Sequence, residues 1–251
     1  MVPDPAEGEG VASARLMADE TIIVNFGRPM PVFPLPGFVL LPHAIQPFHI
    51  FEPRYRQMVA HCLAAADQGG GQIAMATIRR SRVEGVEPLM REAVCVGQIV
   101  QHEALSDGRF NILLQGVCRA RILVVHEPDA EHLYSTVRVS PIERSGAAST
   151  GLEGVRRRLR ALIAGPQLRR LCAADAVLEW IDRKDVPTHA VLEIIAFALV
   201  RDEETRYSLL EDPSAESRAQ TIGGVLASLN RLVASADRQH WKDWPKGLSW
   251  N

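Results

Sequence analysis

Residues 31–66 read PVFPLPGFVLLPHAIQPFHIFEPRYRQMVAHCLAAA, and the pattern of this stretch changes part-way along. The first part holds short apolar runs at 32–35, 38–41 and 47–51, which prolines and one glycine interrupt. Because each proline lacks a backbone donor, these runs are expected at sheet edges, bulges or corners. The second part begins at Pro53, a residue suited to a first helical turn, and spaces its apolar residues as one face of a helix. The stretch therefore predicts a strand, a proline corner, a second strand and a helix.

The residues that follow, as far as position 142, predict more β-structure. Five runs are apolar or alternating and are bounded by turn residues: 72–78, 94–104, 109–119, 122–125 and 134–142. Asp107-Gly108 lies between two of them and signals a hairpin, because glycine accepts a positive φ. Gly116 interrupts its run, which indicates a bulge or a sharp bend. With the opening stretch this predicts about six short, mainly antiparallel strands and one helix, arranged as a small barrel or curled sheet.

The second half of the chain has helical periodicity. Residues 143–151 (ERSGAASTG) are small and polar, which predicts a linker. Apolar stripes at helical spacing then begin at Leu152, Leu168 and Val191, and a last long helix is expected over 214–236. The predicted fold class is therefore α+β, with an N-terminal six-stranded β-barrel-like lobe that contains one helix, followed by a C-terminal α-helical bundle. The predicted divisions are a flexible tail at 1–20, the β-rich lobe at 21–142, the linker at 143–151, the helical bundle at 152–237 and a tail at 238–251.

Charge and composition exclude several classes of partner. The chain has 28 Lys and Arg against 30 Asp and Glu, so its net charge of -2 gives no field that would attract nucleic acid or an anionic membrane. Its one basic cluster, Arg156–Arg160, has no interleaved aromatic residues and is interpreted as a solvated helix face. The longest apolar run, 190–200, is too short to span a bilayer. Without a secretory signal or a C-x-x-C pair, a cytoplasmic protein with reduced, buried thiols is expected.

The sequence also lacks the motifs of several enzyme classes. It has no G-x-x-x-x-G-K-[ST] loop for nucleotide phosphates and no G-x-S-x-G nucleophile elbow. The only lysines are Lys184, Lys242 and Lys246; they lie in charged or terminal segments and do not suit the desolvated base of a Ser–Lys dyad. The histidines show no metal-ligand spacing. No enzymatic activity, cofactor or metal is therefore expected.

Two parts of the opening stretch, PLPGFVLLPH and PFHIFEPRYRQMV, resemble the start of the Lon N-terminal domain, in the version found in stand-alone bacterial Lon-domain proteins and eukaryotic Lon-domain RING proteins. The similarity continues through LSDGRFNILLQGVCR (105–119) and YSLLEDPSAESRAQTI (207–222) and covers roughly 31–236. It implies a six-stranded barrel-like lobe followed by a helical bundle. It also implies recognition of protein substrates, which is a role of this domain in Lon protease. It implies no catalysis, because the ATPase and Ser–Lys peptidase modules of Lon protease lie further along than this chain reaches.

The resulting hypothesis is a non-catalytic module that binds protein or peptide segments and could serve as an adaptor in protein quality control. Its candidate contact residues are Phe38, Pro47, Phe48, Phe51, Arg54 and Tyr55, although each also suits a core position. Self-association and association with a separate protease both stay open. The alternative is an enzyme or small-molecule binder with a cleft between the lobes, which a convergent group of His102, Glu103 or Cys118 would favour.

Overall fold

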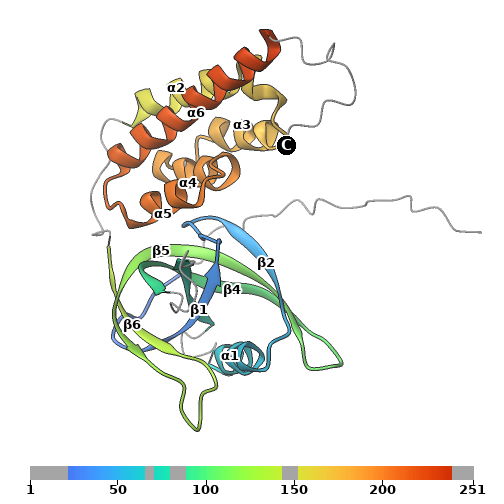
Figure 1. Ribbon diagram of the computed structural model, residues 1–251, viewed down its shortest axis with the longest axis vertical. Coiled ribbons are helices and arrows are strands. Elements are labelled where there is room, and N and C mark those ends of the chain that lie inside the picture. Colours follow the sequence, from blue (N-terminus) through green and yellow to red (C-terminus); the bar gives the residue numbers. More distant parts are fainter. Residues whose placement is uncertain (1–21, 66–70, 80–88, 143–151, 239–251) are drawn as a thin grey trace, which may run out of the picture.

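The computed structural model describes residues 22–65, 71–79, 89–142 and 152–238, and within them the chain forms a mixed α+β fold. Its strands are β1 (Met30–Pro36), β2 (Ile45–Ile50), β3 (Gln72–Arg79), β4 (Leu89–Ala104), β5 (Phe110–His126) and β6 (Thr136–Pro141). Its α-helices are α1 (Pro53–Ala64), α2 (Glu153–Ile163), α3 (Ala174–Asp182), α4 (Thr188–Leu199), α5 (Glu203–Glu211) and α6 (Ala215–Arg238). Helices α2–α6 lie together on one side of the strands, while α1 lies among the strands (Figure 1). The predicted tail 1–20, linker 143–151 and residues 239–251 lie outside the described residues.

The opening stretch folds as predicted, into β1, a corner, β2 and α1. The corner is fastened to β5, because the backbone N–H of His43 donates to the carbonyl of Gly116 at 2.8 Å and the N–H of Gly116 donates to the carbonyl of Ala44 at 2.8 Å. Helix α1 begins at Pro53 and buries one face of helical spacing: Tyr55, Met58, Val59 and Cys62. The stretch therefore joins the edge strand β2 to a helix that packs in the core.

The six strands form one sheet in the order β2-β5-β4-β3-β1-β6, and β6 also pairs with β5. Strands β5, β4, β3, β1 and β6 therefore form a closed circuit of hydrogen-bonded pairs. The β1–β3 pair is parallel and the other pairs are antiparallel, so the prediction of mainly antiparallel strands is confirmed. Strand β2 pairs with β5 alone and carries Pro47, as expected of a proline at a sheet edge, whereas the prolines of β1 lie on a strand that pairs with both β3 and β6.

The prediction of two separate strands at 109–119 and 122–125 was wrong, because β5 runs without interruption from Phe110 to His126. Gly116 marks a bulge inside this strand: Val96 pairs with Cys118 but the next residue, Gly97, pairs with Gly116. A Cβ atom on Gly116 would lie 2.2 Å from the carbonyl oxygen of Leu41. The glycine is thus required by a close backbone approach, and the strand continues through the bulge.

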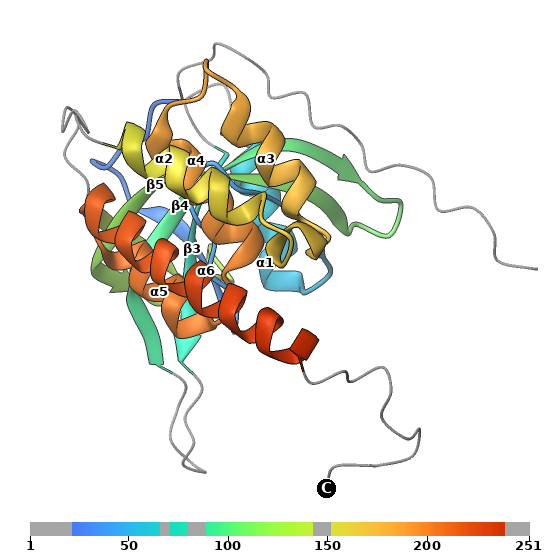
Figure 2. The same ribbon diagram turned by 90° about the horizontal axis from the view of Figure 1, so that it is seen from above.

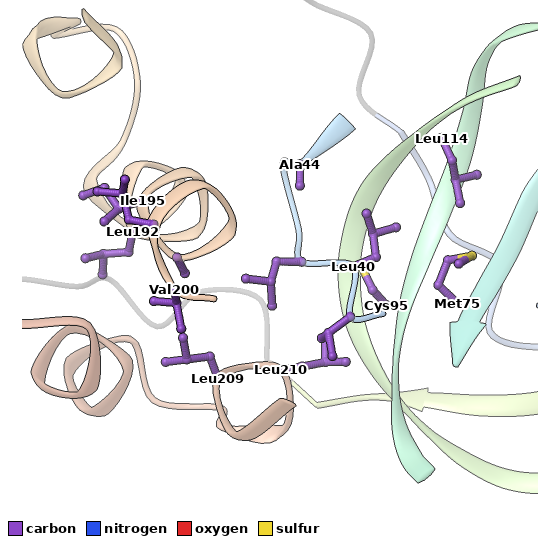
Figure 3. Packing of buried hydrophobic residues seen from close by; sticks show 14 of the residues in the cluster. Leu40, Ala44, Met75, Cys95, Leu114, Leu192, Ile195, Val200, Leu209 and Leu210 are labelled. Atoms are coloured by element: carbon purple, nitrogen blue, oxygen red, sulfur yellow. The ribbon is translucent and has the colours of Figure 1, made fainter. Parts of the chain in front are cut away.

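Neighbouring residues on the strands contribute to two separate apolar clusters. On β3, Ile73 and Met75 belong to a large cluster, whereas Ala74 and Ala76 belong to a small cluster formed mainly by the strands of the closed circuit. The large cluster extends into helices α2–α6. Figure 3 shows Leu40 of the β1–β2 corner between Leu210 of α5 and the strands. The strands and the helices therefore share one continuous core.

The helices follow the predicted stripes with one exception. The stripe that begins at Leu168 is divided between a 3-10 turn, η2 (Leu168–Arg170), and α3. Helix α6 packs against α2 and α4 (Figure 2). Helix α5 contacts the sheet directly, since the backbone N–H of Ala93 on β4 donates to the hydroxyl of Tyr207 at 2.8 Å. The guanidinium of Arg91 lies 3.2 Å from the centre of the same ring.

Three charged side chains are buried where the strands meet the helices. Arg119 of β5 and Arg218 of α6 both form ion pairs with Glu193 of α4, and all three side chains are at most 3% exposed. Arg119 Nε also donates to the carbonyl of Leu209 on α5 at 3.2 Å. Arg218 donates from Nη1 to the carbonyl of Asp212 at 2.8 Å. One carboxylate thus joins a strand to two helices, and the guanidinium groups reach the backbone beside it.

Replacement of Glu193 by Gln is expected to lower the free energy of unfolding by about 3–5 kcal/mol, because two buried guanidinium groups would lose their counter-charge. Urea unfolding followed by circular dichroism measures this change. Glu204→Gln is the control, since the Arg91–Glu204 pair lies at the surface and such pairs contribute at most about 1 kcal/mol. Equal stability of the two variants would contradict the structural role assigned to Glu193.

Candidate functional site

Along β2 and the residue that follows it, side chains alternate between the surface and the interior. Pro47, His49 and Phe51 face solvent, with Phe51 61% exposed, whereas Phe48 is half-buried against the core. Arg54, at the start of α1, is also exposed and forms a surface ion pair with Glu52 at 2.9 Å. Of the six candidates, Pro47, Phe51 and Arg54 can therefore reach a partner without any rearrangement.

The other three candidates are held in an aromatic network. The ring of Phe48 lies edge-on to Phe38 at 5.5 Å and to Phe33 at 5.7 Å, and Phe33 lies 4.5 Å from Tyr55. Tyr55 is only 5% exposed, and burial is the main cause that raises the pKa of its hydroxyl. Phe38 is half-buried and packs against the same core. These rings stabilise the junction between β1, β2 and α1, and whether the exposed candidates contact a partner stays a prediction.

The structure does not bring the alternative catalytic residues together. His102 pairs with Ile112 near the turn of the β4–β5 hairpin, whereas Cys118 pairs with Val96 in the middle of the same two strands. Glu103 is exposed and accepts a hydrogen bond from Asn111 at 2.8 Å. Where β5 meets the helices, the buried Arg119–Glu193 pair occupies the contact instead of an open cleft.

The basic cluster on α2 is solvated only in part, because two of its arginines bond to neighbouring elements. Arg156 donates to the carbonyls of Ile181 and Val186 at 2.8 and 2.7 Å, and Arg160 forms a two-point ion pair with Asp182. These two arginines therefore fasten α2 to α3 and its C-terminal turn.

Among the described residues, no three His, Cys, Asp or Glu side chains are placed to hold a metal ion. No described helix is long and apolar enough to cross a membrane.

The four cysteines are free thiols in different environments. Cys62 and Cys95 are buried, Cys118 is half-buried, and Cys172 is exposed, which corrects the expectation of buried thiols at that position. Burial raises the pKa of the Cys62 thiol to about 12, so it is protonated at neutral pH. A buried, protonated thiol is a poor nucleophile. Cys62 is therefore assigned to the core.

The sequence analysis missed an exposed apolar surface on the β5–β6 hairpin, which projects away from helices α2–α6 (Figure 1). Leu123 is 63% exposed, Leu133 is 52% exposed, and Val124 and Val125 are also exposed. A register shift between Ile122 and Val124 places Leu123 in a bulge. We call these four side chains the hairpin surface. Residues 122–125 are consecutive apolar residues beside an acidic loop, and this pattern could have signalled that not all of them face the core.

The loop of this hairpin is fastened to α1. The side chain of Gln57 accepts a hydrogen bond from the backbone N–H of Leu133 at 2.7 Å and donates to the carbonyl of Glu131 at 3.0 Å. His61 Nδ1 lies 2.9 Å from the hydroxyl oxygen of Tyr134, and the ring of His132 contacts both. The exposed position of Leu133 is therefore held by directional contacts from a helix.

The model of the ATP-dependent protease La (LON) substrate-binding domain matches residues 29–228, most of the chain. The chain belongs to the Lon substrate-binding domain family. No curated protein matches it.

Two solved structures support the Lon-domain fold. The N-terminal domain of a Mycobacterium avium complex Lon protease is 16% identical, with a TM-score of 0.61, and the match covers 80% of this chain and 98% of that one. A Lon N-terminal domain protein from Xanthomonas campestris is 20% identical, with a TM-score of 0.54, and the match covers 78% and 96% of the two chains. At these identities the likeness supports the fold. Membership of the family rests on the family model, whose match extends from β1 through most of α6.

Substitution of two neighbouring phenylalanines is expected to separate the core of this Lon domain from its surface. Phe48→Ala should lower the free energy of unfolding by about 2 kcal/mol or more, because three rings meet there. Phe51→Ala should change it by less than about 0.5 kcal/mol, because the side chain is mainly exposed. Thermal and urea unfolding measure both values. Equal losses for the two variants would contradict the assignment of Phe48 to the core.

Proposed function

We propose that this chain is a non-catalytic module that binds segments of other proteins through the hairpin surface. A protein so bound is called a client. The observation that carries the proposal is the grouping of Leu123, Val124, Val125 and Leu133 on one projecting hairpin. Exposed apolar groups of this kind favour association, because contact with a partner removes them from water. Membership of a substrate-binding domain family supports the same function.

The finer parts of the proposal concern architecture and cellular role. We propose that the closed strand circuit is the barrel-like lobe expected from the sequence and that α2–α6 form the helical bundle. We further propose that the protein works in the cytoplasm as an adaptor in protein quality control, alone or with a separate protease. The exposed candidates Pro47 on β2, Phe51 directly after it and Arg54 at the start of α1 would form a second contact area. A catalytic site at His102, Glu103 and Cys118 lacks support, because the strand register separates Cys118 from the other two.

The hairpin surface is tested with a double variant, Leu123→Ser with Leu133→Ser, and a permanently unfolded probe protein whose cysteines are reduced and carboxymethylated. The variant is expected to bind this probe at least about tenfold more weakly than the wild type, because each leucine buried in a complex contributes about 1.5–3 kcal/mol. Fluorescence anisotropy of the labelled probe gives both dissociation constants.

Leu232→Ser is the matched control, because Leu232 of α6 is 68% exposed and lies outside the hairpin surface. This variant should bind the probe as the wild type does. Circular dichroism checks that all variants remain folded. The proposal fails if the wild type does not bind the probe, or if the double variant and the control bind it equally well.

A further inference from the structure

A cavity of about 400 Å³ lies at the loop end of the β5–β6 hairpin, beside the hairpin surface. We call it the hairpin pocket. Its lining includes Pro31 of β1, His126 at the end of β5, and Glu127, Asp129, His132 and Tyr134 from the loop that leads to β6. The volume falls within the range of about 300–1,000 Å³ that is usual for ligand pockets. The pocket is thus large enough to take one long side chain of a client.

The charge of the hairpin pocket is negative. Glu127 and Asp129 line it, and among the described residues no lysine or arginine does. The pKa of Asp129 lies below its ordinary value because the backbone N–H groups of His132 and Glu131 donate to its carboxylate. These bonds, at 2.7 and 2.9 Å, both end on Oδ1, and from the described part of the chain Oδ2 accepts none. Two carboxylate groups therefore lie beside the cavity, and one of them is oriented by its own loop.

Three of the six other lining residues are aromatic, and the remaining three are Pro29, Pro31 and Thr136. The rings of His126, His132 and Tyr134 border the pocket, and those of His132 and Tyr134 are 5.4 Å apart. Of these rings, the face of Tyr134 can attract a cation through its quadrupole, while His132 Nδ1 lies 3.2 Å from Asp129 Oδ1. Carboxylates form charge-assisted hydrogen bonds with guanidinium and ammonium groups. A pocket that combines both features suits an organic cation.

A neighbouring cavity has the opposite character. It has a volume of about 210 Å³ and shares Pro29, Pro31 and Tyr134 with the hairpin pocket, but its lining includes Arg28 and no carboxylate. The two cavities therefore differ in charge although they share a wall. A cation is expected to select the hairpin pocket of the two.

We propose that the hairpin pocket binds the side chain of an arginine or lysine that lies next to apolar residues in a client segment. The cation pairs with Glu127 and Asp129, while the flanking apolar side chains contact the hairpin surface. This inference rests on the proposed function and adds the class of client: apolar segments that carry a basic residue.

The test compares three fluorescein-labelled peptides, Leu-Gly-Leu-Arg-Leu-Gly-Leu and the versions with Gln or Glu at the central position. The arginine peptide is expected to bind the wild type at least about tenfold more tightly than the glutamine peptide, with a preference that declines as salt is added. The double variant Glu127→Gln with Asp129→Asn should remove this preference. Glu131→Gln is the matched control, because Glu131 belongs to the same loop but does not line the pocket.

A second measurement examines the pocket without the segment. Acetyl-L-arginine amide is titrated into the isotope-labelled chain, and the imidazole signals of His126 and His132 are followed by NMR. Saturable shifts in the wild type and in Glu131→Gln, but not in the double variant, would support the inference even if no peptide bound; in that case the proposed function alone would fail. Equal binding of the arginine and glutamine peptides, or an unchanged preference in the double variant, would overturn the inference and leave segment binding standing.

Discussion

The arrangement of strands and helices depends on one buried carboxylate. Glu193 of α4 receives Arg119 from the closed strand circuit and Arg218 from α6, and the two guanidinium groups also bind backbone carbonyls of Leu209 and Asp212. Apolar contacts between the strands and the helices are extensive, but such contacts do little to fix the orientation of the helices on the strands. The ion pairs fix this orientation, because a shift that separated either guanidinium from the carboxylate would leave a buried charge without its counter-charge. Arginine suits this role, since its planar group can bond a carboxylate and a carbonyl together.

The proposed binding surface lies away from this ion-pair group. The contact between β5 and the helices is filled by side chains, and the β1–β2 corner inserts Leu40 between them (Figure 3). The exposed apolar side chains of the β5–β6 hairpin, by contrast, lie on a part that projects away from α2–α6 (Figure 1). Gln57 fastens the hairpin loop to α1. The hairpin is therefore a defined surface on a rigid support, which lowers the entropic cost of binding a flexible segment.

Much of the fold could be predicted from local patterns. Prolines and glycines marked the corner after β1 and the turn at Gly108, which has a φ of 79°. Helical spacing identified α1, and of the residues predicted to face inward Tyr55, Met58, Val59 and Cys62 are buried, Leu63 is half-buried, and Ala66 lies outside the described residues. Gly116 was recognised as a bulge or bend, but the continuity of β5 was not, because the bulge depends on a backbone approach to Leu41, which is distant in the sequence. Local pattern alone does not show whether a strand continues beyond a bulge.

The candidate site was harder to predict for a physical reason. Apolar residues on a strand usually indicate burial, so residues 122–125 resembled core residues. Their exposure depends on the projection of the hairpin from the sheet, which the local sequence does not show. The same limit applied to Phe38, Phe48 and Tyr55, which suit either a binding surface or a core. Arg119 and Glu193 are 74 positions apart, so no local pattern could have paired them. Long-range contacts of this kind require the three-dimensional structure.

Hydrogen–deuterium exchange with mass spectrometry, on the wild-type chain with and without the unfolded probe protein, tests the central claim most directly. The claim is that clients bind the β5–β6 hairpin. The probe is expected to slow amide exchange at residues 122–126 and 132–134, with little change in α2–α6. Slowed exchange confined to α2–α6, with the hairpin unchanged, would contradict the claim.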